Sequence, residues 1–148
     1  MYLRTARFGE LDATTLYALL RLRVDVFVVE QACPYPELDG RDTEPGTVHV
    51  WLADGDTPAA YLRLLAEPDG SARIGRVCTA AAYRGRGLSA RLVAVALDLA
   101  GDRASVLDAQ AYLVAFYARF GFTPTGPQFV EDGIAHVPMR RLTGPAGA

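Results

Sequence analysis

The sequence predicts an α/β fold of the α+β type, in which a mixed, mostly antiparallel central sheet is flanked by helices. Three strand-like runs in the middle of the chain are joined by the turn sequences DGDTP and PDG, which is typical of an antiparallel meander. An apolar-striped helix and a short apolar run follow, and this order predicts a strand–helix–strand crossover. The 148 residues are enough for one domain with its own core.

Each element has a local signal. Residues 2–8 are expected to form the first strand, and Asp12 is expected to cap a helix that ends near Glu30, before two prolines. That helix carries an apolar stripe of Leu16, Leu19, Leu20, Val24, Phe27 and Val28. Further strands are expected at 48–53, 59–66, 72–79, 104–109, 122–125 and 135–141.

Two more helices complete the predicted order. One has an inward face of Leu88, Leu92, Val95, Ala96 and Leu99. The other covers residues 112–120 and is ended by Gly121. The domain is expected to span residues 1–148, with 142–148 as a flexible tail.

Composition excludes several classes of function. No apolar run is long enough to span a membrane and the N-terminus lacks the core of a signal peptide, so we expect a cytoplasmic protein without a membrane partner. Cys33 and Cys78 form no C-x-x-C pair, which favours a reduced protein without a disulfide. A net charge of −2 argues against nucleic acid as a partner, because phosphate binding needs a basic face.

The charged residues are unevenly distributed along the chain. Between Arg73 and Arg91 there are five arginines and no acid, whereas five acids and one arginine lie between Glu30 and Glu44. The first segment is therefore expected to bind an anion and the second a cation.

The stretch TAAAYRGRGLSARL, residues 79–92, is the strongest candidate for an anion site. Free amide N–H groups at a helix N-terminus favour anions, and Gly85 and Gly87 allow the backbone to approach a pyrophosphate. Arg84 and Arg86 add charge-assisted hydrogen bonds. The chain has no lysine, which excludes a P-loop. The glycine spacing also fits a dinucleotide fingerprint, but that interpretation fails because AAAYR separates the strand from the glycines.

The same stretch carries a family resemblance. Arg84-x-x-Gly87-x-Ser89 resembles motif A of the GNAT superfamily of N-acetyltransferases, R/Q-x-x-G-x-G/A, with a small serine at the last position. The segments LRLRVDVFVVEQACPYPELDGRD, IGRVCTAAAYRGRGLS, AQAYLVAFYARFGF and EDGIAHVPMRR are similar, in the same order, to the ElaA-type branch of that superfamily. The resemblance covers nearly the whole chain.

The resemblance implies the GNAT fold, in which two splayed strands form a notch for an acyl-coenzyme A. It implies acetyl-coenzyme A as the co-substrate, with its pyrophosphate on the loop amides and its pantetheine arm in the notch. The implied cofactor-binding residues are Val77, Cys78, Thr79, Arg84, Gly85, Arg86, Gly87, Leu88, Ser89, Gln110 and Tyr117.

Acetyl transfer to an amine needs a donor for the thioester oxygen, a proton for the leaving thiolate and a base for the amine. By resemblance, the backbone N–H of Cys78 is the oxyanion donor and Tyr117 is the general acid. The base stays open among water, Glu30, Glu37, Asp39, Asp42, His49 and His136. His136 is the leading side chain. A catalytic Cys33 lacks an activating group, and the cysteines and histidines lack metal-site spacing, so no metal is expected.

Together these features predict an acetyl-coenzyme A-dependent N-acetyltransferase that acts on a primary amine of a small, cationic acceptor. The acidic segment is expected to border the acceptor, with Glu30, Glu37, Asp39 and Asp42 on that side. The alternative is a non-catalytic acyl-coenzyme A-binding sensor or interaction module with the same fold, which release of free thiol in the presence of an amine would distinguish. Both a monomer and a homodimer remain open.

Overall fold

The computed structural model describes residues 1–142, so the expected tail at 142–148 lies outside the described residues apart from its first position. The strands are β1 (Tyr2–Ala6), β2 (Val48–Asp54), β3 (Thr57–Ala66), β4 (Ala72–Thr79), β5 (Ser105–Gln110), β6 (Thr123–Pro124), β7 (Phe129–Glu131) and β8 (Ile134–Arg141). The helices are α1 (Ala13–Val24), which continues as a π-helix over Asp25–Glu30, α2 (Leu88–Ala100) and α3 (Val114–Ala118).

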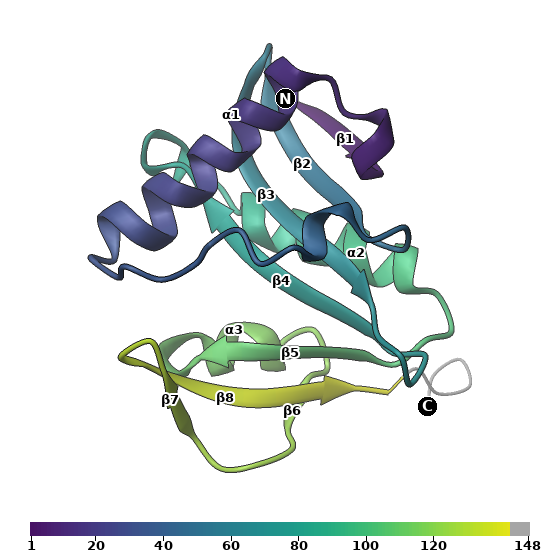
Figure 1. Ribbon diagram of the computed structural model, residues 1–148. Helices are drawn as coiled ribbons and strands as arrows, with labels where there is room; N and C mark the ends of the chain where they lie inside the picture. The colour runs from purple at the N-terminus through teal and green to yellow at the C-terminus, as the bar shows by residue number, and fades with distance from the viewer. Residues whose placement is uncertain (143–148) are drawn as a thin grey trace.

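The described strands form one eight-stranded sheet in the order β1-β2-β3-β4-β5-β8-β6, with β7 paired to β8 (Figure 1). Only β4 and β5 run parallel, which confirms the predicted mixed, mostly antiparallel sheet. The sequence analysis missed β7. It joins β8 through Asp132 and Gly133, both with positive φ, and an Asp-Gly pair is a strong signal for such a hairpin.

The helix signals were mostly correct. The Asp12 carboxylate accepts a hydrogen bond from the Thr15 N–H at 2.7 Å and caps α1 as predicted. Along α2, the buried positions recur every four residues and reach Ala100. The expectation that Leu99 points inward was therefore wrong, because the residue is 41% exposed.

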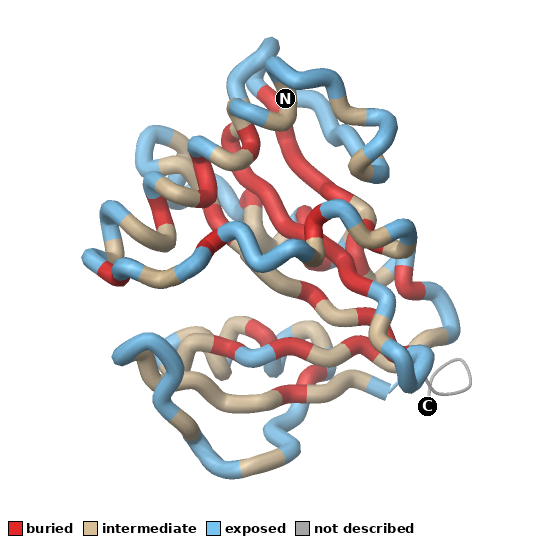
Figure 2. The backbone as a smooth tube through the Cα atoms, viewed as in Figure 1, coloured by how far each residue is buried: buried red, intermediate tan, exposed pale blue. Residues whose placement is uncertain are grey.

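Helices cover both faces of the sheet (Figures 1 and 2). The larger core, under α2 and α3, includes Val50, Leu62, Ile74, Leu92, Leu107 and Phe122. The smaller core, under α1, includes Leu19, Leu22, Val26, Trp51, Tyr61 and Cys78. No helix within residues 1–142 is long and apolar enough to cross a membrane.

The strands β4 and β5 separate part-way along their length. They pair only where Ala72 meets Ser105 and Arg73 meets Val106, and beyond these pairs they diverge (Figure 1). On its other edge β4 has a bulge at Arg76, whose φ is 53°, and the register against β3 shifts there. The divergence is the notch that the family resemblance implied.

Candidate active site

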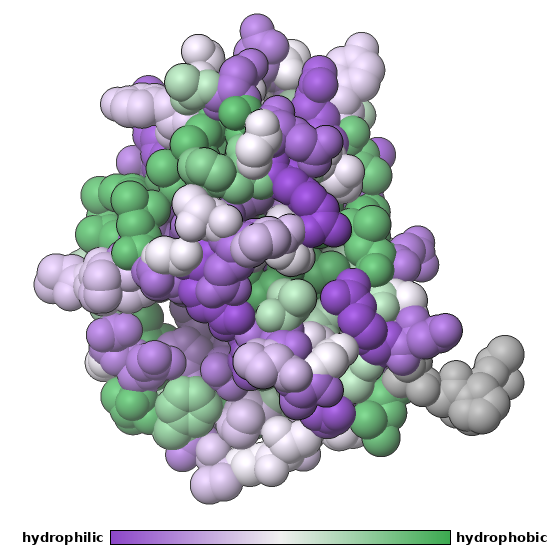
Figure 3. Space-filling model, turned by 45° about the vertical axis from the view of Figure 1, so that its right-hand side comes forward, coloured by the Kyte–Doolittle hydropathy of each residue, from purple (hydrophilic) through white to green (hydrophobic). Residues whose placement is uncertain are grey.

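A cavity of about 900 Å³ opens where β4 and β5 diverge. Figure 3 shows a hollow in the surface with hydrophilic side chains around it. Of the residues singled out from the sequence, those that line the cavity are Glu30, Cys33, Asp39, Val77, Cys78, Thr79, Arg84, Ser89, Gln110, Tyr117 and His136. Those that do not line it are Glu37, Asp42, His49, Gly85, Arg86, Gly87 and Leu88.

The loop before α2 has the geometry of an anion site. Gly85 and Gly87 have φ values of 79° and 72°, and a Cβ on either would meet no described atom within 4 Å. Gly87 is the N-cap of α2, whose first amide N–H groups have no intrahelical partner. Ser89 Oγ lies 2.8 Å from Thr79 Oγ1 and so ties the start of α2 to β4. Open space over bare donors at a helix N-terminus is what a pyrophosphate requires.

The two arginines of this loop differ in their partners. Arg84 Nη1 lies 2.7 Å from Oε2 of Glu30, and Arg84 Nε donates to the carbonyl oxygen of Thr79 at 3.1 Å. The hydrogen bond from Arg84 lowers the pKa of the Glu30 carboxyl. The Arg86 guanidinium lies over the ring of Tyr83, 5.2 Å from its centroid, and forms no ion pair within residues 1–142. Arg86 is therefore the loop cation without a carboxylate partner in the described chain.

The N–H of Cys78 faces β3 and not the notch. The Ala80 N–H donates to the Ala59 carbonyl at 2.8 Å, and Cys78 pairs with Tyr61 in the same register. Because hydrogen-bonded pairs alternate along an antiparallel ladder, Cys78 and Tyr61 exchange N–H···O bonds. This geometry contradicts the expectation that the Cys78 N–H is the oxyanion donor. The N–H of Thr79 points the other way, into the notch.

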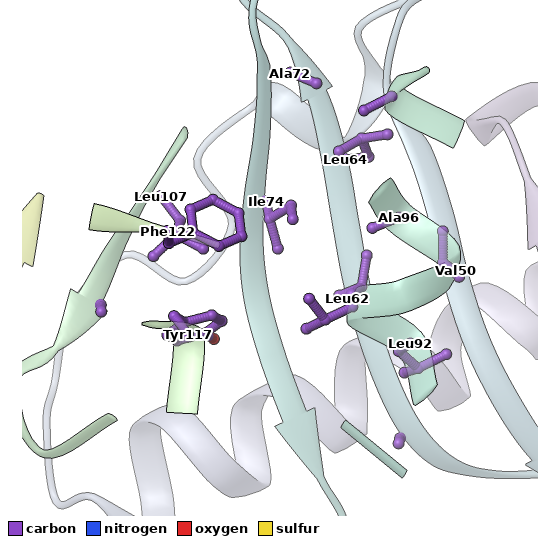
Figure 4. Close-up of a cluster of buried hydrophobic side chains, with 14 of the residues drawn as sticks. Val50, Leu62, Leu64, Ala72, Ile74, Leu92, Ala96, Leu107, Tyr117 and Phe122 are labelled. Atoms are coloured by element: carbon purple, nitrogen blue, oxygen red, sulfur yellow. The ribbon is translucent and has the colours of Figure 1, made fainter. Parts of the chain in front are cut away.

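Tyr117 lines the cavity from α3. In Figure 4 it lies beside Phe122, with Ile74 of β4 facing them across the core. Its ring packs edge-on against Phe116 and Phe122, at centroid distances of 5.0 and 6.1 Å, and its hydroxyl has no hydrogen-bond partner within residues 1–142. Burial raises the pKa of this hydroxyl to about 12, so it keeps its proton at neutral pH.

His136 lines the cavity from β8. Its Nδ1 lies 2.8 Å from the carbonyl oxygen of Ile134, and this contact assigns the ring proton to Nδ1. The imidazole stacks on Phe129 at a centroid distance of 5.7 Å. In this tautomer Nε2 carries the lone pair, which is the form that a general base needs.

Arg23 of α1 is buried and holds two acids of the segment that follows this helix. Its Nε lies 2.7 Å from Oε2 of Glu37 and its Nη1 lies 2.7 Å from Oδ1 of Asp42, while its side chain is 1% exposed. Neither carboxylate lines the cavity. The structure therefore contradicts the predicted place of Glu37 and Asp42 on the acceptor side. They serve as counter-charges for a buried guanidinium.

The other acids between residues 30 and 44 are also paired. Asp39 accepts a hydrogen bond from Arg63 Nη1 at 2.9 Å, and Glu44 lies 3.2 Å from Arg41 Nε. Burial acts to raise the pKa of Asp39, but the hydrogen bonds from Arg63 and the Arg41 amide, together with the charges of Arg63 and Arg76, outweigh it and hold that pKa well below its usual range. Asp39 does line the cavity, but with its charge balanced. The charge count missed most of these pairs because, apart from Arg41, the arginines come from α1, β3, β4 and the loop before α2.

Three acids outside the segment between residues 30 and 44 also line the cavity: Asp108, Glu131 and Asp132. Asp108 of β5 lies 3.4 Å from Arg73 Nη1. Glu131 and Asp132 lie at the β7–β8 turn, and within residues 1–142 neither of these two carboxylates forms an ion pair. The Cys33 thiol donates to the Asp132 carbonyl oxygen at 3.2 Å and links this turn to the segment after α1. The side-chain amides of Gln31 and Gln110 also meet, at 3.4 Å. An Asp-Gly turn could have located the hairpin, but not the cavity beside it.

The remaining candidates are structural. Both cysteines are free and buried, and burial raises the pKa of the Cys78 thiol to about 12, which keeps it protonated at neutral pH. His49 is buried, with Nδ1 2.6 Å from Tyr61 Oη and Nε2 3.1 Å from the Asp42 carbonyl oxygen. Among residues 1–142 no group of three His, Cys, Asp or Glu side chains is placed to hold a metal ion.

A family model described as an acetyltransferase (GNAT) domain matches residues 21–143. The chain belongs to the GNAT family. It is 54% identical over 144 residues to a UPF0039 protein of Mycobacterium tuberculosis (strain H37Rv), covering 94% of this chain and 92% of that one. It is 41% identical over 139 residues to protein ElaA of Escherichia coli (strain K12), covering 90% and 91%. The suspected ElaA-like branch is confirmed.

Solved structures show the same relationship. An acyl-CoA N-acyltransferase from Pseudomonas aeruginosa matches with a TM-score of 0.90 and 41% identity, covering 95% of this chain and 99% of that one. An aminoglycoside 6′-N-acetyltransferase complexed with coenzyme A shares the fold alone, with a TM-score of 0.73 at 12% identity over 96% and 99% of the chains. This chain therefore has the fold of GNAT acyl-CoA N-acyltransferases, a family whose donor is an acyl-coenzyme A.

Proposed function

We propose that this GNAT protein transfers an acetyl group from acetyl-coenzyme A to the primary amine of a small, cationic acceptor. The observation that carries the proposal is that one cavity is lined by the two ends of the motif A loop, Arg84 and Ser89, by the open edge of β4 and by Tyr117. In the reaction a C–N bond forms and the C–S bond of the thioester breaks. The amine loses one proton and the coenzyme thiolate gains one.

The motif A loop would hold the coenzyme. Its pyrophosphate is expected on the bare amides from Gly85 to Ser89, with charge added by Arg84 and Arg86. The pantetheine arm is expected along the free edge of β4, where the Thr79 N–H points into the notch. These groups bind by backbone donors and positive charge, which matches an elongated ligand with an anionic end.

Three groups of this chain would act on the reacting atoms. Tyr117 holds its proton at neutral pH and is assigned as the general acid for the leaving thiolate. His136 is assigned as the base, because its Nε2 lone pair is available. The oxyanion donor is assigned to an amide of β4 next to Cys78, either Thr79 or, beside the bulge, Val77.

The acceptor would be recognised by charge at the β7–β8 turn. Glu131 and Asp132 line the cavity without an arginine partner in the described chain, whereas the acids between residues 30 and 44 are neutralised. A cationic amine would therefore meet its attractive carboxylates at this turn. Exposed carboxylates of this kind contribute about 0–1 kcal/mol each, so they favour a class of amine and do not define one molecule.

Release of free thiol from acetyl-coenzyme A in the presence of amines tests the proposal. We expect turnover with diamines or other cationic amines to exceed that with neutral amines of the same length. Glu131→Gln with Asp132→Asn should raise the acceptor KM and leave the acetyl-coenzyme A KM unchanged. Coenzyme binding without thiol release from any amine would instead support the sensor function, and a preference for neutral or anionic amines would refute the cationic acceptor.

A further inference from the structure

Residues 30–33 touch three separate parts of the active site. Glu30 pairs with Arg84 of the motif A loop, on the β4 side of the notch. Gln31 contacts Gln110 at the end of β5, and the Cys33 thiol contacts the β7–β8 turn. In Figure 1 the end of α1 lies beside the gap between the two halves of the sheet. The segment is therefore anchored on the β5 side and presents Glu30 to the loop on the other side.

We infer that Glu30 is a built-in competitor of the coenzyme: it occupies Arg84 in the coenzyme-free protein, and the coenzyme pyrophosphate displaces it. Glu30 is then a residue that sets coenzyme affinity. This inference rests on the proposed function, because it takes the motif A loop as the pyrophosphate site.

The hydrogen bonds of Arg84 leave it no free edge for an anion. Nη1 and Nη2 both contact the Glu30 carboxylate, at 2.7 and 2.8 Å, and Nε donates to the Thr79 carbonyl oxygen. A guanidinium binds an anion most strongly through two parallel N–H groups on one edge. A pyrophosphate can use such an edge of Arg84 only when Glu30 leaves it. Arg86 is not restrained in this way, since it stacks on Tyr83.

The exchange is energetically easy. The side chains of Arg84 and Glu30 are 44% and 45% exposed, and an exposed pair of this kind changes an equilibrium constant by a factor of about five at most. A pyrophosphate carries more charge than one carboxylate and also gains the helix N-terminus, so it wins the competition. The pair lowers the affinity slightly and does not block the site.

The backbone supports a positioned role for Glu30. The π-helix ends at Glu30, and Ala32 has a φ of 50°, a left-handed conformation that alanine adopts only where surrounding contacts hold it. Gln31 and Cys33, on either side of Ala32, make the contacts that hold the segment. Glu30 is thus kept beside the loop by its neighbours as well as by Arg84.

Isothermal titration calorimetry with coenzyme A tests this inference without requiring turnover. Glu30→Gln should bind coenzyme A about two- to fivefold more tightly than the wild type. In an Arg84→Gln background the same change should have no effect, because the competition needs Arg84. Asp25→Asn is the matched control: it removes one charge from the same π-helix, and Asp25 pairs only weakly with Arg21, at 3.9 Å and away from the cavity. It should leave the affinity unchanged.

The possible failures are distinguishable. Unchanged or weaker binding by Glu30→Gln, with normal binding by the wild type, overturns this inference alone and shows that Glu30 orients Arg84 or is neutral. An equal gain in the Arg84→Gln background also overturns it, since long-range repulsion then explains the effect. A wild-type protein without affinity for coenzyme A contradicts the proposed function as well.

Discussion

Replacing Arg23 with methionine tests whether the acids between residues 30 and 44 are structural. Methionine keeps much of the aliphatic stem and removes the charge from a side chain that is 1% exposed. Breaking a buried ion pair costs about 3–5 kcal/mol. Here Glu37 keeps Arg76 at 2.8 Å and Asp42 keeps Arg63 at 3.1 Å, so each acid retains one counter-charge. We therefore expect the lower end of the range, about 3 kcal/mol of lost stability.

The assay is urea and thermal unfolding followed by circular dichroism. For a chain of this size, 1 kcal/mol corresponds to about 2–4 °C in Tm, so the variant should melt about 6–12 °C below the wild type. Arg21→Met is the matched control, two residues away on the same helix. Arg21 faces Asp25 at 3.9 Å with side chains 75% and 61% exposed, and its loss should change stability by no more than about 0.5 kcal/mol.

The opposite result has a clear meaning. If Glu37 and Asp42 attracted the acceptor, as the sequence suggested, Arg23→Met would release two carboxylates and lower the KM of a cationic amine. A loss of stability below about 1 kcal/mol, together with such a fall in KM, would refute the structural assignment.

Three further predictions concern the loop, the acid and a buried histidine. Acetyl-coenzyme A at a hundredfold excess over Kd should stabilise the wild type by about 2.7 kcal/mol. Gly87→Val should abolish this stabilisation, because a φ of 72° excludes a β-branched residue. A thermal shift that persists in the folded variant would contradict coenzyme binding at the motif A loop. Tyr117→Phe should lower kcat by about 10²- to 10⁴-fold at unchanged coenzyme affinity. An unchanged rate of the chemical step would show that Tyr117 is not the general acid. Burial lowers the pKa of His49, so the unfolded chain binds its proton first and stability should fall as the pH drops below about 6.5. Urea titrations at pH 5 and 7 should show this fall in the free energy of unfolding for the wild type and a smaller fall for His49→Gln. The same pH dependence of stability in both proteins would contradict a lowered pKa at His49.

Local signals were enough for most of the fold. The run at 72–79 matched β4 at both ends, and Asp12 capped α1, because a turn sequence or a capping carboxylate acts on the neighbouring backbone. The prediction that Leu99 points inward was wrong because the buried face of α2 is set by the sheet and not by a local signal. Ala100, and not Leu99, continues that face. The bulge at Arg76 has no sequence signal, since a positive φ at an arginine is imposed by tertiary contacts.

The candidate site was predictable only in part, for electrostatic reasons. The motif A glycines, Gly85 and Gly87, adopt positive φ values that glycine alone adopts readily, so the loop could be located from the sequence. The acidic segment could not be interpreted from its charge count, because a carboxylate attracts a ligand only if no nearer cation neutralises it. Such cations lie far away in the chain and are brought together by the fold.

The buried charges cancel in one network of Arg23, Arg63, Arg76, Glu37, Asp39 and Asp42. The three positive and three negative groups give the network no net charge, and their contacts fix α1 and the following segment to β3 and β4. The charges that remain for ligands are then Arg86 at the motif A loop and Glu131 with Asp132 at the β7–β8 turn, none of which has an ion-pair partner within residues 1–142. Under the proposed function, the anionic end of the coenzyme would be drawn to the β4 side of the notch and a cationic amine to the β5 side, and both would meet in the cavity that Tyr117 lines.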